Sequence, residues 1–273
     1  MKKFEGVLFC TDLDGTLYSD DKTVSEENLA AIEYFRSEGG LFTFVTGRVP
    51  ITATAICDVI KPNAPYGCIN GGGIYDPARG KYLWNVKLAD GFIELVKEVD
   101  EKLPDIGFQF NTETEICFNK DNGAMRRFRA VTGVPHIHRP YASFLEPVLK
   151  VVFGSEREED VEALAELLGS HPLAHRFDFI RSERTLYEIL PKGVSKGTAL
   201  RKLAELLGIS MEKTVSVGDY YNDISMLKEA RLGFAVANAV EAAKLAADHS
   251  VCDNNHHAIA EIIDGLDSGK FKI

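Results

Sequence analysis

Several features are scarce in this sequence, and each scarcity excludes a class of protein. No apolar run approaches the roughly 20 residues of a membrane-spanning helix. Asp12 and Asp14 interrupt the first apolar stretch too early for a secretory signal. Lysine and arginine form no dense run, and the formal net charge is −10, which disfavours binding to a nucleic-acid backbone. We expect a soluble, cytoplasmic protein that binds neither membranes nor nucleic acids.

Cysteine is also sparse, and its spacing is unlike that of metal-binding cysteine pairs. The chain has five cysteines, and none belongs to a Cys-x-x-Cys motif. The odd number and wide spacing argue against a disulfide framework or a zinc site. We expect reduced thiols that are mostly buried as small apolar side chains, and we do not expect Cys10 to be catalytic. Otherwise the composition is that of an ordinary globular protein, with 45% hydrophobic and 26% charged residues.

The first apolar run is followed by two aspartates. Residues 7–10 lack strict alternation, which predicts a strand buried on both faces, as in a parallel sheet. Asp12 and Asp14 follow it, and Gly15 allows a sharp turn. Taken alone, these residues also fit a solvated Asp-Gly turn. At the carboxyl edge of a parallel sheet, however, the two carboxylates would lie where α/β folds bind ligands.

The order of the remaining elements predicts two domains. Helix and strand patterns alternate in residues 25–69 and again in residues 198–263, which is typical of βαβ units around a parallel sheet. Between them, residues 106–118 alternate loosely, as a pair of half-exposed strands would. We therefore predict an α/β domain of residues 1–83 and 191–273 that is split by an inserted α+β domain of residues 84–190.

Polar side chains follow three of the predicted strands, and a lysine opens a helix. They are Asp12 and Asp14, Thr46, Asp219 with Asn222 and Asp223, and Lys196. Parallel strand ends share one edge of a sheet, so we expect these side chains to converge. Crowded carboxylates repel one another, and a divalent cation reverses that repulsion. Oxygen ligands without paired histidines or cysteines point to Mg²⁺.

A magnesium site beside a lysine and a threonine suits phosphoryl transfer, which requires positioning and neutralisation of spreading negative charge. One aspartate could attack the phosphorus and form an aspartyl-phosphate. A second aspartate two residues later could protonate the leaving oxygen and then activate water.

Four segments resemble, in order, the motifs of the haloacid dehalogenase-like hydrolases, and their spacing resembles the Cof-type sugar-phosphatase branch. The segments are Asp12-Leu13-Asp14-Gly15-Thr16, Thr46-Gly47-Arg48, Lys196 in Lys-Gly-x-x-Lys-Gly, and Gly218-Asp219-x-x-Asn222-Asp223. The resemblance spans nearly the whole chain. It implies a Rossmann-like core, a large α/β cap between the second and third motifs, and Mg²⁺-dependent hydrolysis of phosphate monoesters.

The resemblance also implies a role for each motif residue. Asp12 would be the nucleophile and a Mg²⁺ ligand, and Asp14 the general acid/base whose carbonyl also binds Mg²⁺. Asp219 would bind Mg²⁺ directly. The phosphate-binding residues would be Thr46, Gly47, Lys196 and Asn222, and the residues that support the metal would be Asn222 and Asp223.

Some alternatives stay open. The expected substrate is a small phosphorylated metabolite, such as a sugar or cofactor phosphate. A phosphomutase or a non-catalytic metabolite-binding regulator could keep the same residues. Residues 70–73 could bind an anion through backbone amides or form only a tight turn. Near the carboxyl end, His256 and His257 replace residues of the family's Asn-rich turn, which leaves the role of that loop open.

Overall fold

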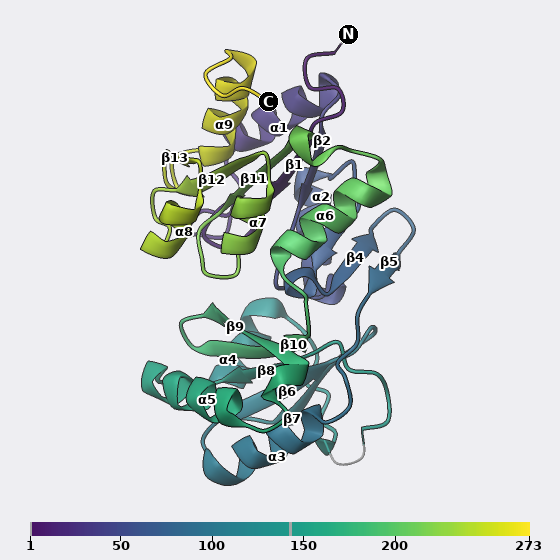
Figure 1. The fold of residues 1–273 in the computed structure, drawn as a ribbon, viewed down its shortest axis with the longest axis vertical. Helices are drawn as coiled ribbons and strands as arrows, with labels where there is room; N and C mark the ends of the chain where they lie inside the picture. The colour runs from purple at the N-terminus through teal and green to yellow at the C-terminus, as the bar shows by residue number, and fades with distance from the viewer. Residues whose placement is uncertain (1, 142–143) are drawn as a thin grey trace. The chain divides into compact units, whose positions relative to one another are not determined.

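The protein is described from a computed structural model, in which residues 2–141 and 144–273 are placed. The chain forms two compact units (Figure 1). The core unit comprises Met1–Trp84 and Ser195–Ile273, and the inserted unit comprises Asn85–Val194. Within the described residues, no helix combines the length and the apolar character that crossing a membrane requires.

A five-stranded parallel sheet organises the core unit, in the order β13-β12-β11-β1-β2. The strands are β1 (Leu8–Thr11), β2 (Leu41–Phe44), β11 (Thr214–Gly218), β12 (Leu232–Val236) and β13 (His249–Val251). This sheet confirms the expected Rossmann-like α/β class. β13 was not predicted, because only the last of its three residues is buried and no apolar run marks it.

Helices cover both faces of this sheet. On β1, Leu8 and Cys10 pack with residues of α6, whereas Phe9 lies between them in sequence and contacts Phe35 of α1. Successive side chains of a strand point to opposite faces, so α1 and α6 lie on opposite sides. The core-unit helices are α1 (Glu26–Ser37), α2 (Pro50–Ile60), α6 (Lys196–Leu207), α7 (Ile224–Glu229), α8 (Glu241–Ala246) and α9 (Ala258–Asp267).

Local chemistry sets where the main helices begin and end. The side chain of Ser25 accepts a hydrogen bond from the backbone amide of Asn28 at the start of α1. Ser195 and Thr198 form a reciprocal capping box that starts α6 one residue before Gly197. Gly208 ends α6 in the left-handed conformation. The capping box therefore puts Lys196 in the first turn of its helix.

A small antiparallel sheet completes the core unit. It contains β3 (Tyr66–Cys68), β4 (Gly73–Asp76) and β5 (Lys81–Asn85). Between β3 and β4 the chain makes a short 3-10 turn at Ile69–Gly71. A side chain at Gly71 would lie 1.8 Å from the carbonyl oxygen of Ser195, and its φ is +100°. This segment is thus a tight turn packed against the start of α6, with glycine required at its end.

The inserted unit has an antiparallel sheet in the order β7-β6-β8-β10-β9. Its strands are β6 (Gly107–Asn111), β7 (Ile116–Lys120), β8 (Lys150–Gly154), β9 (Phe177–Glu183) and β10 (Leu186–Pro191), and its helices are α3 (Phe92–Lys102), α4 (Gly123–Thr132) and α5 (Glu158–Ser170). Residues 106–118 contain the expected pair of strands, β6 and the first part of β7. The expectation that they are half-exposed is wrong, because all five residues of β6 are buried.

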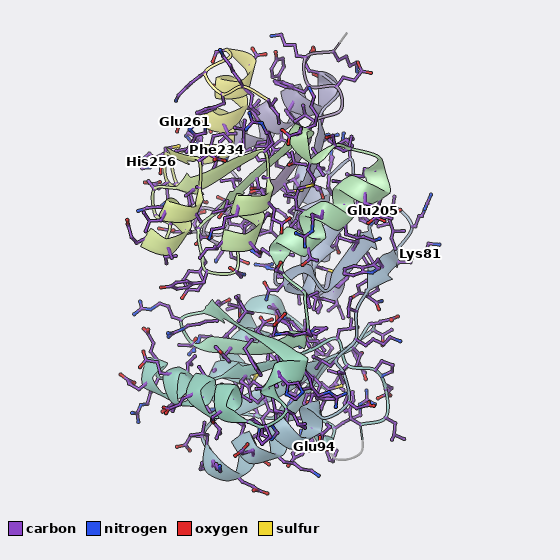
Figure 2. The ribbon with its side chains drawn as sticks, viewed as in Figure 1. Lys81, Glu94, Glu205, Phe234, His256 and Glu261 are labelled. Carbon is purple, nitrogen blue, oxygen red and sulfur yellow. The ribbon has the colours of Figure 1, made fainter. Side chains whose placement is uncertain are left out.

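Side chains show the contrast between core and surface in both units (Figure 2). Phe234 of β12 is fully buried and packs edge-on against Phe271 with ring centroids 4.8 Å apart. Lys81, Glu94 and Glu205 are exposed. The interiors are therefore apolar, and the buried polar residues described below stand out against them.

Candidate active site

Asp12 and Lys196 meet at the carboxyl edge of the parallel sheet. Asp12 directly follows β1, and its amide donates to the carbonyl of Val217 on β11. Lys196 donates from Nζ to Asp12 Oδ1 at 2.5 Å. Both side chains are almost completely buried, at 1% exposure for Lys196 and 8% for Asp12. A buried ammonium is tolerated only when it is paired, and Asp12 provides a carboxylate partner for Lys196.

Asp223 is the second partner of Lys196. Its Oδ1 accepts from Lys196 Nζ at 2.6 Å. Its Oδ2 accepts from the backbone amides of Asp219 and Tyr220, both at 3.0 Å. Burial disfavours the charged lysine, but the two carboxylates outweigh this and raise the pKa of Lys196. Asp223 thus fixes both the ammonium and the loop that carries Asp219.

Asp219 lies on the other side of the same cluster. Its Oδ1 accepts a hydrogen bond from Thr16 Oγ1 at 2.9 Å. Burial and the negative charge of Asp223 raise the pKa of Asp219 to about 7. Burial also raises the pKa of Asp12, against the opposing effect of Lys196. Two carboxyls of this cluster therefore resist ionisation unless another cation is close.

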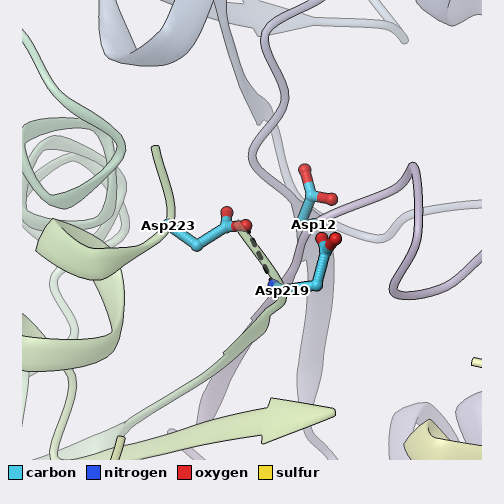
Figure 3. A group of neighbouring side chains, drawn as sticks. All are labelled: Asp12, Asp219 and Asp223. Carbon is cyan, nitrogen blue, oxygen red and sulfur yellow. Dashed lines mark hydrogen bonds between the residues drawn. The ribbon is translucent and has the colours of Figure 1, made fainter. Parts of the chain in front are cut away.

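The three aspartates form a group that could hold a metal ion (Figure 3). One oxygen from each of Asp12, Asp219 and Asp223 lies within 4.8 Å of the others. The donors are carboxylate oxygens, which suit a hard divalent cation. Because both oxygens of Asp223 already accept hydrogen bonds, Asp12 and Asp219 are the better direct ligands, and Asp223 is better suited to support them. The raised pKa values fit a site whose carboxylates are stabilised by a cation.

Asp14 has a different environment from Asp12. Arg48 donates to it from two nitrogens, Nε to Oδ2 at 3.0 Å and Nη2 to Oδ1 at 2.8 Å. Lys22 donates to Oδ1 at 3.2 Å. Burial opposes ionisation, but the attraction and hydrogen bonds of Arg48, with help from Lys22, outweigh it and lower the pKa of Asp14. The protein thus raises the pKa of Asp12 and lowers the pKa of Asp14, although both aspartates belong to one motif.

The second motif and Asn222 are joined through Asn70. The backbone amide of Asn70 donates to the carbonyl of Thr46 at 3.1 Å, and Asn222 Nδ2 donates to Asn70 Oδ1 at 3.0 Å. A side chain added at Gly47 would come within 3.0 Å of Asn70 Oδ1. Thr46 is 2% exposed, and its Oγ1 accepts from the amide of Arg48. Glycine at position 47 therefore lets this loop approach Asn70.

The loop after Asp14 is held by two asparagines from the carboxyl-terminal part of the chain. Asn238 donates to the carbonyl of Gly15 at 2.8 Å, and its Oδ1 accepts from the amide of Asn254. Asn254 is 5% exposed and donates to the carbonyl of Tyr18 at 3.0 Å and to Asp20 Oδ1 at 3.1 Å. The Asn-rich turn whose role the sequence left open thus contacts the loop that carries the first motif.

Sequence reasoning left several of these residues without a role. In the sequence, Arg48 is recognisable only as part of a loop motif, and Asn70 only as part of a glycine-rich turn. Arg48 directly follows Thr46-Gly47, so its position at a strand end was the available signal. Asn238 gave no signal of its own, because its contacts with Gly15 and Asn254 join residues that are 223 and 16 positions away in the sequence.

Comparison with known proteins gives the family. The family model of haloacid dehalogenase-like hydrolases matches residues 9–263. A 5-amino-6-(5-phospho-D-ribitylamino)uracil phosphatase of Bacillus subtilis is 27% identical over 95% of this chain and 98% of its own. A pyridoxal phosphate phosphatase of Escherichia coli is 27% identical over 92% of this chain and 95% of its own.

The fold agrees with this assignment. A haloacid dehalogenase-like hydrolase from Bacteroides thetaiotaomicron has a TM-score of 0.82 at 23% identity, covering 95% of this chain and 99% of that one. Its low identity makes it a likeness of fold, and that likeness extends over both units. The family match and the phosphatase relatives together lead to one conclusion: the chain belongs to the haloacid dehalogenase-like hydrolases and is a phosphoric monoester hydrolase.

Proposed function

We propose that this protein is a Mg²⁺-dependent phosphatase that hydrolyses phosphate monoesters of small metabolites through an aspartyl-phosphate on Asp12. One observation carries the proposal: a buried Asp12 paired with Lys196 at 2.5 Å lies within the same carboxylate group as Asp219. A nucleophile, a compensating cation and oxygen ligands are therefore available in one place.

In the first step, a carboxylate oxygen of Asp12 attacks phosphorus, and the bond from phosphorus to the ester oxygen breaks. Lys196 offsets the charge of Asp12, so two anions can approach each other. Thr46, Gly47 and Asn222 would contribute donors to the phosphoryl oxygens. Asp14 in its protonated form gives its proton to the departing alkoxide, which leaves as the alcohol.

In the second step, the acyl-phosphate on Asp12 is hydrolysed. Asp14, now ionised, accepts a proton from water, and the water oxygen attacks phosphorus. The bond between phosphorus and Asp12 breaks, which releases inorganic phosphate and restores the carboxylate. Arg48 and Lys22 favour the ionised form of Asp14, the form that this second step needs.

The residues fit Mg²⁺ as the partner of this chemistry. Asp12 and Asp219 would bind it through carboxylate oxygens and Asp14 through its backbone carbonyl, while Asn222 and Asp223 would support these ligands. Bound there, the ion would neutralise charge that builds up on the phosphoryl oxygens. Thr16 holds Asp219 through its hydroxyl group and so orients one of the ligands.

The phosphatases named above support the substrate class. One relative is named for a phosphorylated ribityl pyrimidine and another for pyridoxal phosphate. Both names describe small metabolites that carry one phosphate ester. We propose the same class here, either sugar phosphates or cofactor phosphates, with the inserted unit acting as a cap that selects among them.

A phosphate-release screen tests this function. The purified protein is incubated with a panel of sugar and cofactor phosphates and with p-nitrophenyl phosphate, in the presence of Mg²⁺. We expect inorganic phosphate from at least one ester, loss of activity with EDTA and recovery when Mg²⁺ is returned. Conversion of a sugar phosphate into an isomer without phosphate release would favour a phosphomutase, and binding without any turnover would contradict an enzyme altogether.

A further inference from the structure

The turn between β3 and β4 holds three successive residues in the left-handed conformation. The φ angles are +58° at Ile69, +50° at Asn70 and +100° at Gly71. Glycine adopts such angles freely, but a residue with a Cβ atom does so at a cost, which is largest for a β-branched residue such as isoleucine. Ile69 is 0% exposed and Asn70 is 1% exposed, so contact with solvent does not compensate for this cost. Strained backbone that is kept in a buried turn points to a function there.

The backbone of this turn is hydrogen-bonded to the second motif. The amide of Ile69 donates to the carbonyl of Arg48 at 3.0 Å, and the amide of Asn70 donates to the carbonyl of Thr46 at 3.1 Å. On its other side the turn packs against the start of α6. The turn is therefore held between the second motif and the helix that begins with Lys196.

The side chain of Asn70 contacts the fourth motif. Asn222 Nδ2 donates to Asn70 Oδ1 at 3.0 Å, across 152 positions of the sequence. A carboxamide nitrogen carries two hydrogens, so Asn70 accepts one of them and leaves the other for a further acceptor. With Asn70 Oδ1 in this place, a reversed Asn222 amide would bring two carbonyl oxygens together without a hydrogen between them. Asn70 therefore favours one orientation of the Asn222 amide, and with it one direction for the second N–H.

Asn70 itself has too little exposed surface to contact a substrate. It is 1% exposed, whereas Asn222 is half-buried. In the proposed reaction Asn222 donates to a phosphoryl oxygen, and such a donor contributes most when it is held in place before the charge develops. The hydrogen bond to Asn70 supplies this preorganisation, because the turn that carries Asn70 is itself bonded to the second motif.

We propose that Asn70 is a positioning residue of the active site, which orients the amide of Asn222 toward the phosphoryl group. The left-handed turn gives Asn70 a backbone position from which its side-chain oxygen meets Asn222 while its amide meets Thr46. One residue thereby joins the second and fourth motifs, which both belong to the proposed phosphate-binding site. This inference rests on the proposed function and adds to it a residue that acts through Asn222 rather than on the substrate.

A double-mutant cycle tests this role with the variants Asn70→Gly and Asn222→Ala and their combination. Glycine removes the side-chain acceptor and adopts a φ of +50° without strain, so the first variant should fold. For the best substrate of the phosphate-release screen, we expect Asn70→Gly to lower kcat/KM roughly tenfold and to raise the inhibition constant of inorganic phosphate. Asn222→Ala should lower kcat/KM by at least as much. The combination should lose little more than Asn222→Ala alone, because Asn70 then has no amide to orient.

Asn28→Ala is the matched control. Asn28 of α1 is also 1% exposed, and its Oδ1 accepts a hydrogen bond from the amide of Ala260 at 3.0 Å. We expect this variant to lower the melting temperature and to leave kcat/KM and inhibition by phosphate unchanged. An effect on stability without an effect on catalysis is what a purely structural asparagine would show.

Two results would contradict the role of Asn70 while leaving the proposed function in place. One is an unchanged kcat/KM in Asn70→Gly. The other is a combined variant whose loss equals the product of the two single losses, because independent sites multiply in this way. If the wild-type protein hydrolyses no ester of the panel, the proposed function fails and this inference fails with it.

Discussion

Arg48 and Asp14 form a bidentate ion pair, with nitrogen–oxygen distances of 2.8 and 3.0 Å. The guanidinium also lies over the ring of Tyr18, 5.6 Å from its centroid, and donates to the carbonyl of Thr52. Arg48 is therefore fixed by three partners, and it fixes Asp14 in turn. This pairing matters because the proposed acid/base must both give and accept a proton in one catalytic cycle.

Replacing Arg48 with methionine should move the pH dependence of the reaction. The loss of a positive charge and of two hydrogen bonds raises the pKa of Asp14. We expect the limb of the kcat/KM profile that reports Asp14 to shift to higher pH, and kcat at neutral pH to fall about 10- to 100-fold. Arg48→Lys keeps the charge but loses the bidentate geometry. We expect its pH profile and its kcat to lie between those of the wild-type protein and the methionine variant. A profile that does not move in either variant would separate Arg48 from proton transfer.

Asp12→Asn should abolish phosphate release, because an amide cannot form the acyl-phosphate. We expect a loss of roughly 10³-fold or more in kcat, measured by phosphate release, with an unchanged far-ultraviolet circular dichroism spectrum. Cys10→Ala is the control for the nearby thiol, which burial keeps protonated by raising its pKa. It should retain turnover. Substantial activity in Asp12→Asn would remove Asp12 from the nucleophile role.

Stabilisation by Mg²⁺ should depend on pH through Asp219. Its folded-state pKa of about 7 lies above the ordinary value of 3.8, so the folded protein holds this proton more tightly than the unfolded chain. Without metal, the free energy of unfolding contributed by this group falls as the pH rises from about 4 to about 7. Mg²⁺ binds the ionised form and competes with the proton.

Melting curves at pH 5 and pH 8, with and without Mg²⁺, measure this effect. We expect a fixed Mg²⁺ concentration to raise the melting temperature more at pH 8 than at pH 5. Asp219→Asn removes the titrating group, and we expect it to reduce the rise in melting temperature caused by Mg²⁺ at both pH values. Equal shifts at the two pH values in the wild-type protein would show that proton and metal do not compete at Asp219.

Asn254→Ala should loosen the loop that carries the first motif. The variant leaves the carbonyl of Tyr18 and a carboxylate oxygen of Asp20 without the amide that now donates to them. We expect a loss of about 1–3 kcal/mol in the free energy of unfolding from denaturant titration, and a fall in kcat larger than any rise in KM. Asn255→Ala is the control, since Asn255 also contacts Asp20 but is exposed.

That control should change stability by no more than about 0.5 kcal/mol, as is usual for exposed positions. If Asn254→Ala lowers stability but leaves kcat and KM untouched, Asn254 supports the fold without positioning the site. If Asn254→Ala and Asn255→Ala change the free energy of unfolding, kcat and KM equally, the burial of Asn254 does not explain the effect of its contacts.

The end of the Asn-rich turn shows why residue identity alone was ambiguous there. His257 has a φ of +63° and directly precedes α9. That left-handed conformation favours glycine, so histidine bears a backbone cost that the sequence does not display. Its Nδ1 lies 3.5 Å from Oε2 of Glu27, a residue near the opposite end of the sequence. His256 instead contacts its near neighbour Asp253.

The wrong expectation about the exposure of β6 has a similar cause. Gln109 and Asn111 alternate with Phe108 and Phe110, and alternation of polar and apolar residues usually marks one solvated face. Here both faces are buried. Periodicity reports which residues share a face, but what covers that face is decided by other segments of the chain.

The sequence by itself determined the parallel core, the interruption by a second unit and the set of acidic, lysine and threonine residues at strand ends. These follow from local patterns: apolar runs, caps, and polar residues where strands must stop. Only the tertiary structure decided that Asp14 is paired with Arg48, that Asn254 contacts Tyr18 and that Gln109 is buried. Such contacts join residues 34 and 236 positions apart, and local periodicity holds no information about which distant residue closes the loop.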